Sequence, residues 1–144
     1  LALFIVGNAK DNQPNKLLLY DLVSRTSSTL ATGIGRSLER MPDGRLSFVD
    51  KADTSRPMLS AVEPNGSGIA PLVMMPSGCD DICWMQDGTA LTTQGTSILR
   101  WKAGMKTWNV LATIDGIRGP VSRLRTNAAG SMIVFSVLEP LQTP

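Results

Sequence analysis

The chain has no histidine and only two cysteines among its 144 residues. Histidine is the commonest general base and the commonest transition-metal ligand in proteins, so these residues cannot complete a Ser-His-Asp or Cys-His catalytic arrangement. We therefore expect no catalytic constellation, no metal site and no cofactor in this chain. Whether it belongs to an enzyme stays open, because catalytic residues can lie in another segment.

Charge is sparse, and its two signs nearly cancel: 14 basic and 12 acidic residues leave a net charge of +2. A surface that follows phosphates usually carries clustered lysine and arginine, so nucleic acid is not an expected partner. The neighbouring residues Arg118, Arg123 and Arg125 are better explained as a solvated rim than as a phosphate site. No apolar run approaches the roughly 18 residues that a membrane-spanning helix needs, so we expect no membrane insertion.

The sequence repeats itself with a period of 42 to 44 residues, measured between Gly44, Gly88 and Gly130. Each of these glycines follows an aspartate or a small residue, as in the stretches MPDGRLSF and MQDGTAL. Six positions before each glycine stands an aliphatic residue: Leu38, Ile82 and Leu124. Aspartate bonds its own backbone and glycine accepts a positive φ, so the Asp-Gly pairs mark tight turns rather than a functional site.

Short apolar stretches follow each of these turns, with side chains alternating at spacing two, as in Leu46/Phe48 and Ile133/Phe135. No window offers the i, i+3, i+4, i+7 pattern of an amphipathic helix. Units of about 40 to 45 residues with four short strands are typical of β-propeller blades. An ordinary sandwich has no reason to repeat one glycine register three times. The sequence therefore predicts an all-β propeller of four-stranded antiparallel blades, with about three blades and part of a fourth.

The stretches MPDGRLSFVD at residues 41–50 and AVEPNGSG at residues 61–68 resemble the blades of TolB-like propellers, a WD-repeat-related family. The resemblance extends over nearly the whole chain, although the last unit has Ala128-Ala129-Gly130 in place of Pro-Asp-Gly. It implies a noncatalytic scaffold that binds a protein or peptide partner, exported to the periplasm or outside the cell. The alternative that it implies is an accessory or gating propeller domain of an enzyme, such as a prolyl-oligopeptidase-like serine peptidase. A Gly-x-Ser-x-Gly elbow and a histidine elsewhere in the protein would favour this alternative.

The predicted blades cover residues of about 1–33, 36–75 and 80–114, and a further blade begins at 122–138. Closed propellers need at least four blades, so this chain is not expected to close on itself. Because it begins with Leu1 and shows no leader pattern, we expect it to be part of a longer propeller. Two copies around one axis, or a second chain, are the alternatives. In a simple head-to-tail dimer the first strand and the strand at 132–137 would compete for one position.

Three local stretches invite a more specific function. Cys79 and Cys83 flank two aspartates. An extended chain holds the Cα atoms of such cysteines ~13 Å apart, whereas a disulfide requires ~4.4–6.8 Å. A zinc ion would lack the further cysteine or histidine ligands that it needs. We expect Cys79 in a loop and Cys83 in an innermost strand. The oxygen-rich stretch 8–15 lacks the ordered carboxylates of a calcium loop and is expected to be a solvated hairpin. Asn65-Gly66-Ser67 fits a glycosylation sequon but is explained by a tight turn.

In a propeller, the loops between blades share one face with the loops that join each blade's second and third strands. The loops predicted on this face include residues 33–36, 51–56, 76–81 and 115–122. Loops on a rigid scaffold usually carry the binding contacts. We therefore predict a polar mouth lined by the charged residues of these loops: Arg36, Arg56, Asp80, Asp81 and Arg118. Trp84, Trp101 and Trp108 are expected to pack between blades, with Trp108 the most exposed.

Overall fold

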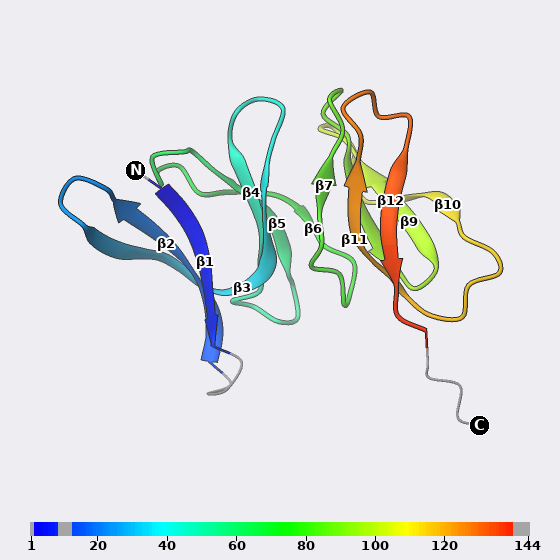
Figure 1. The fold of residues 1–144 in the computed structure, drawn as a ribbon, viewed down its shortest axis with the longest axis horizontal. Coiled ribbons are helices and arrows are strands. Elements are labelled where there is room, and N and C mark those ends of the chain that lie inside the picture. The colour runs from blue at the N-terminus through cyan, green and yellow to red at the C-terminus, as the bar shows by residue number, and fades with distance from the viewer. Residues whose placement is uncertain (1, 9–12, 140–144) are drawn as a thin grey trace. The chain divides into compact units, whose positions relative to one another are not determined.

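A computed structural model describes residues 2–8 and 13–139, which form strands, turns and connecting loops (Figure 1). Helices are absent from these residues, and all strand pairs are antiparallel, so the predicted all-β class is confirmed. The strands in chain order are β1 Ala2–Asn8, β2 Gln13–Asp21, β3 Thr26–Arg40, β4 Leu46–Asp50, β5 Met58–Val62, β6 Ala70–Met74, β7 Cys83–Trp84, β8 Ala90–Gln94, β9 Ser97–Trp101, β10 Asn109–Thr113, β11 Val121–Thr126 and β12 Ile133–Val137.

The chain divides into two compact units, an N-terminal unit Leu1–Met75 and a C-terminal unit Pro76–Pro144. The N-terminal unit is one sheet in the order β1-β2-β3-β4-β5-β6. Its core is built from alternate positions of neighbouring strands: Leu17, Ile34, Phe48 and Val62, all at most 4% exposed. Burying one such side chain contributes roughly 1.5–3 kcal/mol, so this cluster is what holds the strands in register.

The strand β3 differs from the prediction, which placed a loop at residues 33–36. Its 15 residues are continuous, and they pair with β2 up to Ile34 and with β4 from Ile34 to Arg40. The pairing register with β4 shifts between Ile34 and Leu38, and Gly33 takes a φ of 79° beside this irregularity. A β-bulge lets a strand bend and change partners while strand pairing continues on both sides of the irregularity. The predicted loop is therefore wrong, and the predicted boundary between the first two blades falls inside one strand.

The C-terminal unit contains a four-stranded sheet in the order β10-β9-β8-β7 and a two-stranded sheet of β11 and β12. A cluster of buried side chains joins the two sheets: Cys83, Leu91, Ile98, Val121 and Leu124. Half-buried residues of the second sheet and of the connecting loops pack against it, among them Phe135 of β12. The isolated pair β11–β12 would be marginal in water, so its packing on the larger sheet is what stabilises it.

The two Asp-Gly turns that predicted the repeat have the same geometry. In the first turn the Met41 N–H donates to the Arg45 carbonyl at 2.8 Å, and the Gly44 N–H donates to the Met41 carbonyl at 3.0 Å. In the second turn Met85 and Gly88 donate the corresponding bonds, at 2.8 and 3.1 Å. Gly44 and Gly88 have φ values of 93° and 83°, a region that glycine enters without steric cost. The sequence repeat is thus a repeat of backbone structure.

The third turn has no aspartate and keeps only the bond donated by its glycine, because the N–H at its first position reaches a carbonyl five residues ahead instead of four. The Asn127 N–H donates to the Met132 carbonyl at 3.2 Å, and the Gly130 N–H donates to the Asn127 carbonyl at 2.9 Å. The side-chain oxygen of Asn127 accepts the N–H groups of Ser131 and Met132, both at 2.9 Å. In this turn the capping side chain is an asparagine at the first position. In the other two turns it is an aspartate at the third position.

Candidate functional site

A group of polar contacts ties the loop before β7 to β8 and β11, and we call it the Asp81 anchor. The Thr92 hydroxyl donates to the Asp81 carbonyl at 2.7 Å, and the Arg123 N–H donates to the Asp81 carboxylate at 3.2 Å. The Thr93 hydroxyl donates to the Val121 carbonyl at 2.8 Å. Thr92 and Thr93 are buried, so these bonds satisfy groups that water does not reach. The anchor fixes the loop and the start of β11 to the same strand.

Arg123 has an unusual backbone at this anchor. Its φ is 52°, a left-handed value that costs a residue with a side chain roughly 1–2 kcal/mol. It lies where the pairing of β11 with β12 shifts register, between Ser122 and Arg125. The carboxylate of Asp81 accepts the N–H of this strained residue, so the contact helps to hold Arg123 in its left-handed conformation. The sequence contains no local signal for this contact, because its two partners are 42 residues apart.

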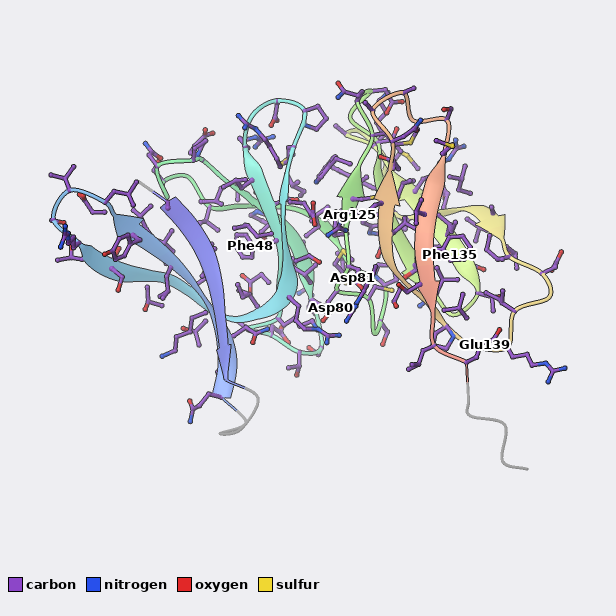
Figure 2. All side chains as sticks on the ribbon, in the orientation of Figure 1. Phe48, Asp80, Asp81, Arg125, Phe135 and Glu139 are labelled. Carbon is purple, nitrogen blue, oxygen red and sulfur yellow. The ribbon has the colours of Figure 1, made fainter. Side chains whose placement is uncertain are left out.

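The predicted mouth residues of the C-terminal unit lie close in the chain to the anchor. Asp80 and Asp81 are half-buried in the loop before β7 (Figure 2), and Arg118 is exposed in the connection between β10 and β11. This connection is fixed at its end by the Val121 N–H, which donates to the Gly95 carbonyl at 2.8 Å. Asp81 thus has a structural role that the sequence did not indicate, whereas Asp80 and Arg118 stay candidate contact residues.

The predicted mouth residues of the N-terminal unit are both exposed. Arg36 lies within β3 rather than in the predicted loop, next to Gly35, whose carbonyl accepts the Asn15 side-chain amide at 3.4 Å. Arg56 ends the turn between β4 and β5, where its N–H donates to the Asp53 carbonyl at 3.1 Å. The convergence of all five predicted residues on one mouth stays a prediction.

The two cysteines are buried and form no disulfide, with Cys79 in the loop and Cys83 in β7, as expected from the sequence. The Cys79 thiol donates to the Thr93 carbonyl at 2.9 Å, so it adds a contact to the Asp81 anchor. Within residues 2–8 and 13–139, no group of three or more acidic, cysteine or histidine side chains is placed to hold a metal ion. The oxygen-rich stretch 8–15 falls largely outside the described residues, so its prediction is untested.

The turn aspartates have lowered pKa values, for local reasons. The Ser55 hydroxyl, the Ser55 N–H and the charge of Arg56 lower the pKa of the Asp53 carboxyl. For Asp87 the N–H of Thr89 is the largest cause of the lowered pKa. Asn65 accepts the Ser67 N–H at 3.0 Å in the same way, which agrees with the interpretation of its sequon as a tight turn. These groups shape turns and do not assemble a catalytic site.

A row of three tryptophans crosses the four-stranded sheet. Trp84 of β7 lies opposite Ala90 of β8, which lies opposite Trp101 of β9. The small side chain of Ala90 leaves room for the two indoles to meet edge to face, with ring centroids 6.4 Å apart at 79°. Trp108, just before β10, continues the row 6.4 Å from Trp101. Trp101 is 5% exposed and its two neighbours are half-buried, so the row is packed, with accessible ends.

These antiparallel sheets, with their repeated turns and short strands, define a partial β-propeller. Among solved structures the chain is similar to TolB from Acinetobacter baumannii, with a TM-score of 0.67 and 17% sequence identity. The match covers 95% of this chain but only 35% of the TolB chain, so the present chain spans about a third of that protein. At this identity the likeness shows the fold alone. No family model and no curated protein matches the sequence.

The described residues contain no helix that is both long and apolar enough to cross a membrane. The exposed positions of Arg118, Arg123 and Arg125 agree with the solvated rim expected from the sequence. The division into blades at about 1–33, 36–75, 80–114 and 122–138 stays a prediction.

Proposed function

We propose that this chain is part of a noncatalytic β-propeller of the TolB-like type, which binds a protein or peptide partner through loops on one face. The fold-level likeness to TolB over 95% of the chain supports this proposal. The resemblance of its Pro-Asp-Gly and Asn-Gly-Ser-Gly stretches to TolB-like blades points the same way. By the same resemblance, we propose that the protein is exported to the periplasm or outside the cell.

The observation that carries the proposal is the Asp81 anchor. Binding surfaces gain affinity when their loops are held in one conformation before the partner arrives. The anchor holds the loop before β7 through Thr92 and the backbone of Arg123, at 2.7 and 3.2 Å. Asp80 lies in the loop fixed in this way, and the exposed Arg118 lies in the connection whose end is fixed by the bond from the Val121 N–H to the Gly95 carbonyl. Together they offer both signs of charge to a partner, which suits a polar protein surface better than an apolar ligand.

The experiment compares wild type with charge variants in affinity purification from an envelope fraction, with quantitative mass spectrometry. The double variant Asp80→Asn/Arg118→Ala should lower recovery of a specific partner at least tenfold. The variant Arg36→Ala/Arg56→Ala, measured separately, tests whether the N-terminal unit contributes to the same mouth. Arg40→Ala is the matched control, because Arg40 is an exposed arginine at the opposite end of β3 from its pairing with β2.

Retention of the partner by all three variants alike would refute the polar mouth. Recovery of a peptidase as the partner would instead favour the accessory or gating role for an enzyme, and the same variants would then measure docking to it. Each variant is checked by circular dichroism, so that loss of fold is not mistaken for loss of binding.

A further inference from the structure

The strand β10 is an open edge of the four-stranded sheet. Among the described residues it pairs only with β9, and all five of its residues are exposed. Two of them are large and apolar: Val110 is 61% exposed and Leu111 41%. Natural proteins usually protect such edges with charges or proline, and residues 109–113 contain neither. A single bulge between Val110 and Ala112 is its only irregularity in pairing.

The backbone of β10 presents hydrogen-bonding groups to the open side. The Ile114 N–H donates to the Thr96 carbonyl at 2.9 Å, which makes Thr113 and Ser97 a non-hydrogen-bonded pair. In such a pair the N–H and C=O groups point away from the partner strand. The N–H and C=O of Thr113 therefore face the side on which an added strand would lie.

The side chains around this edge are predominantly basic. Residues 96–115 include Arg100, Lys102 and Lys106, all exposed, against one acidic residue, the exposed Asp115. Lys102 contacts Asp87 at 3.4 Å, but both side chains are more than half exposed, and such a pair contributes little. An acidic partner thus gains attraction along the hairpin, while a basic partner is repelled.

One face of the β9–β10 hairpin is apolar and the other is polar, and this difference selects the side chains of an added strand. Val110 lies opposite Leu99 on the face that carries Trp101, while Asn109 lies opposite Arg100 on the other face. Trp108 extends the apolar side toward the edge, since its ring is 6.4 Å from that of Trp101. An extended peptide of alternating residues would place apolar side chains beside Val110 on the tryptophan face, and carboxylates beside Asn109 on the face that carries Arg100, one strand away from Arg100 itself.

We propose that β10 is a strand-addition site for an extended acidic peptide in which apolar and acidic residues alternate. Main-chain bonds to groups such as those of Thr113 supply affinity, and the two faces supply specificity. The site is distinct from the polar mouth and does not depend on it. A second copy of the chain pairing through the same edge is the competing occupant, and the experiment separates the two.

The probe is an eight-residue blocked peptide of alternating glutamate and valine, and its control is a peptide of alternating lysine and valine. Binding to the full 144-residue chain is followed by tryptophan fluorescence and by amide shifts in NMR spectra. The acidic peptide should bind at least tenfold tighter than the basic one, and the affected amides should include Thr113. Equal binding of the two peptides, or shifts that avoid β10, would overturn the proposal.

Two variants at one position test the backbone contact. Thr113→Pro removes an N–H that faces the open side and leaves the bonds to β9 in place, a position where edge strands accept proline. Thr113→Val keeps the N–H and removes only the hydroxyl, which contacts the Ser97 hydroxyl at 3.2 Å. The proline variant should lose at least tenfold in affinity and the valine variant less than about twofold. Equal affinity of the two variants would contradict strand addition.

If the proline variant does not fold, a charge variant still tests the proposed preference for an acidic peptide. Arg100→Glu/Lys106→Glu alters two exposed side chains and should invert the preference in favour of the basic peptide. An unchanged preference would overturn the proposed electrostatic selection. Light scattering of the chain alone tests whether two copies pair through β10. If the chain self-associates and Thr113→Pro abolishes this self-association, a second copy rather than the acidic peptide occupies the edge.

Discussion

Single carboxylates and amides within turns determine much of the local structure. Asp43, Asp53, Asn65 and Asp87 each accept the N–H two residues further on, at 2.9 to 3.1 Å. Such a bond copies a backbone turn with a side chain and so selects the turn over competing conformations. Asp43 also forms an ion pair with Arg45 at 2.7 Å. The turns are therefore sensitive to the charge of a side chain that lies largely in water.

The stability of the turn at Asp43 should depend on pH. The side-chain bond from Arg45, followed by the Arg45 N–H, lowers the pKa of the Asp43 carboxyl from its ordinary value of 3.8. A lowered folded pKa adds stability that is present above the unfolded pKa and is lost as pH falls through the folded pKa. Asp43→Asn should therefore cost about 0.5 kcal/mol at pH 7, the size expected of an exposed ion pair, and progressively less as the pH falls below 3.8 and through the lowered folded pKa.

Urea denaturation of both proteins between pH 7 and pH 2.5 measures this difference. Asn at this position can still cap the turn, so the difference reports the charge rather than the loss of the turn. If the difference in unfolding free energy between wild type and variant stayed constant down to the lowest pH, the ion pair with Arg45 would not stabilise the fold.

The sequence predicted these residue-scale features where the signal was local. Asp-Gly pairs indicated the first two turns, and the i, i+4 spacing of Cys79 and Cys83 argued against a disulfide between them. The capping by Asn127 was missed because it acts from a different position of the turn. The bond between Asp81 and Arg123 could not be predicted, since neither residue has an unusual neighbourhood in the sequence and only the tertiary fold brings them together.

The pairing partners of a strand depend on more than its own pattern of apolar residues. Alternating apolar residues after the glycine turns predicted β4 and β12, because both signals lie within a few residues. The continuity of β3 was not predicted, because Gly33 resembles a turn residue, and only the pairing with both β2 and β4 shows that the strand continues through it. The tryptophan row was also missed, since it requires the register of three strand pairs rather than the sequence of one strand.

The tryptophan row makes a prediction about Ala90, which is fully buried between Trp84 and Trp101. Ala90→Leu adds three carbon atoms where the two rings meet and should cost about 1–3 kcal/mol of unfolding free energy, the usual range for overpacking. Urea denaturation measures this cost, and near-ultraviolet circular dichroism should show altered tryptophan bands. The control Ala103→Leu, in the exposed turn before β10, should change stability by less than about 0.5 kcal/mol. Equal effects of the two variants would mean that the row is not tightly packed.

Over the whole molecule, stability should follow the position of each strand within its own sheet. β4, β5 and β8 are paired on both sides and are largely buried, whereas β10 and β12 each end a sheet and carry exposed residues. Strands at open edges open locally with a small free energy, while central strands exchange their amide hydrogens through larger opening. The two buried clusters, one around Phe48 and one around Leu91, give each unit its own protected centre.

In native-state hydrogen exchange, the central amides of β4, β5 and β8 should exchange at least about a hundredfold more slowly than the amides of β12. This ratio corresponds to a difference of roughly 3 kcal/mol in opening free energy. Within the edge hairpin the pattern should alternate, with the Ile114 amide protected by its bond to Thr96 and the Thr113 amide unprotected. Protection of Thr113 in the chain alone would mean that the open side of β10 is already occupied. Uniform exchange across β8 and β10 would contradict the sheet order itself, since a strand paired on both sides cannot open as readily as one paired on a single side.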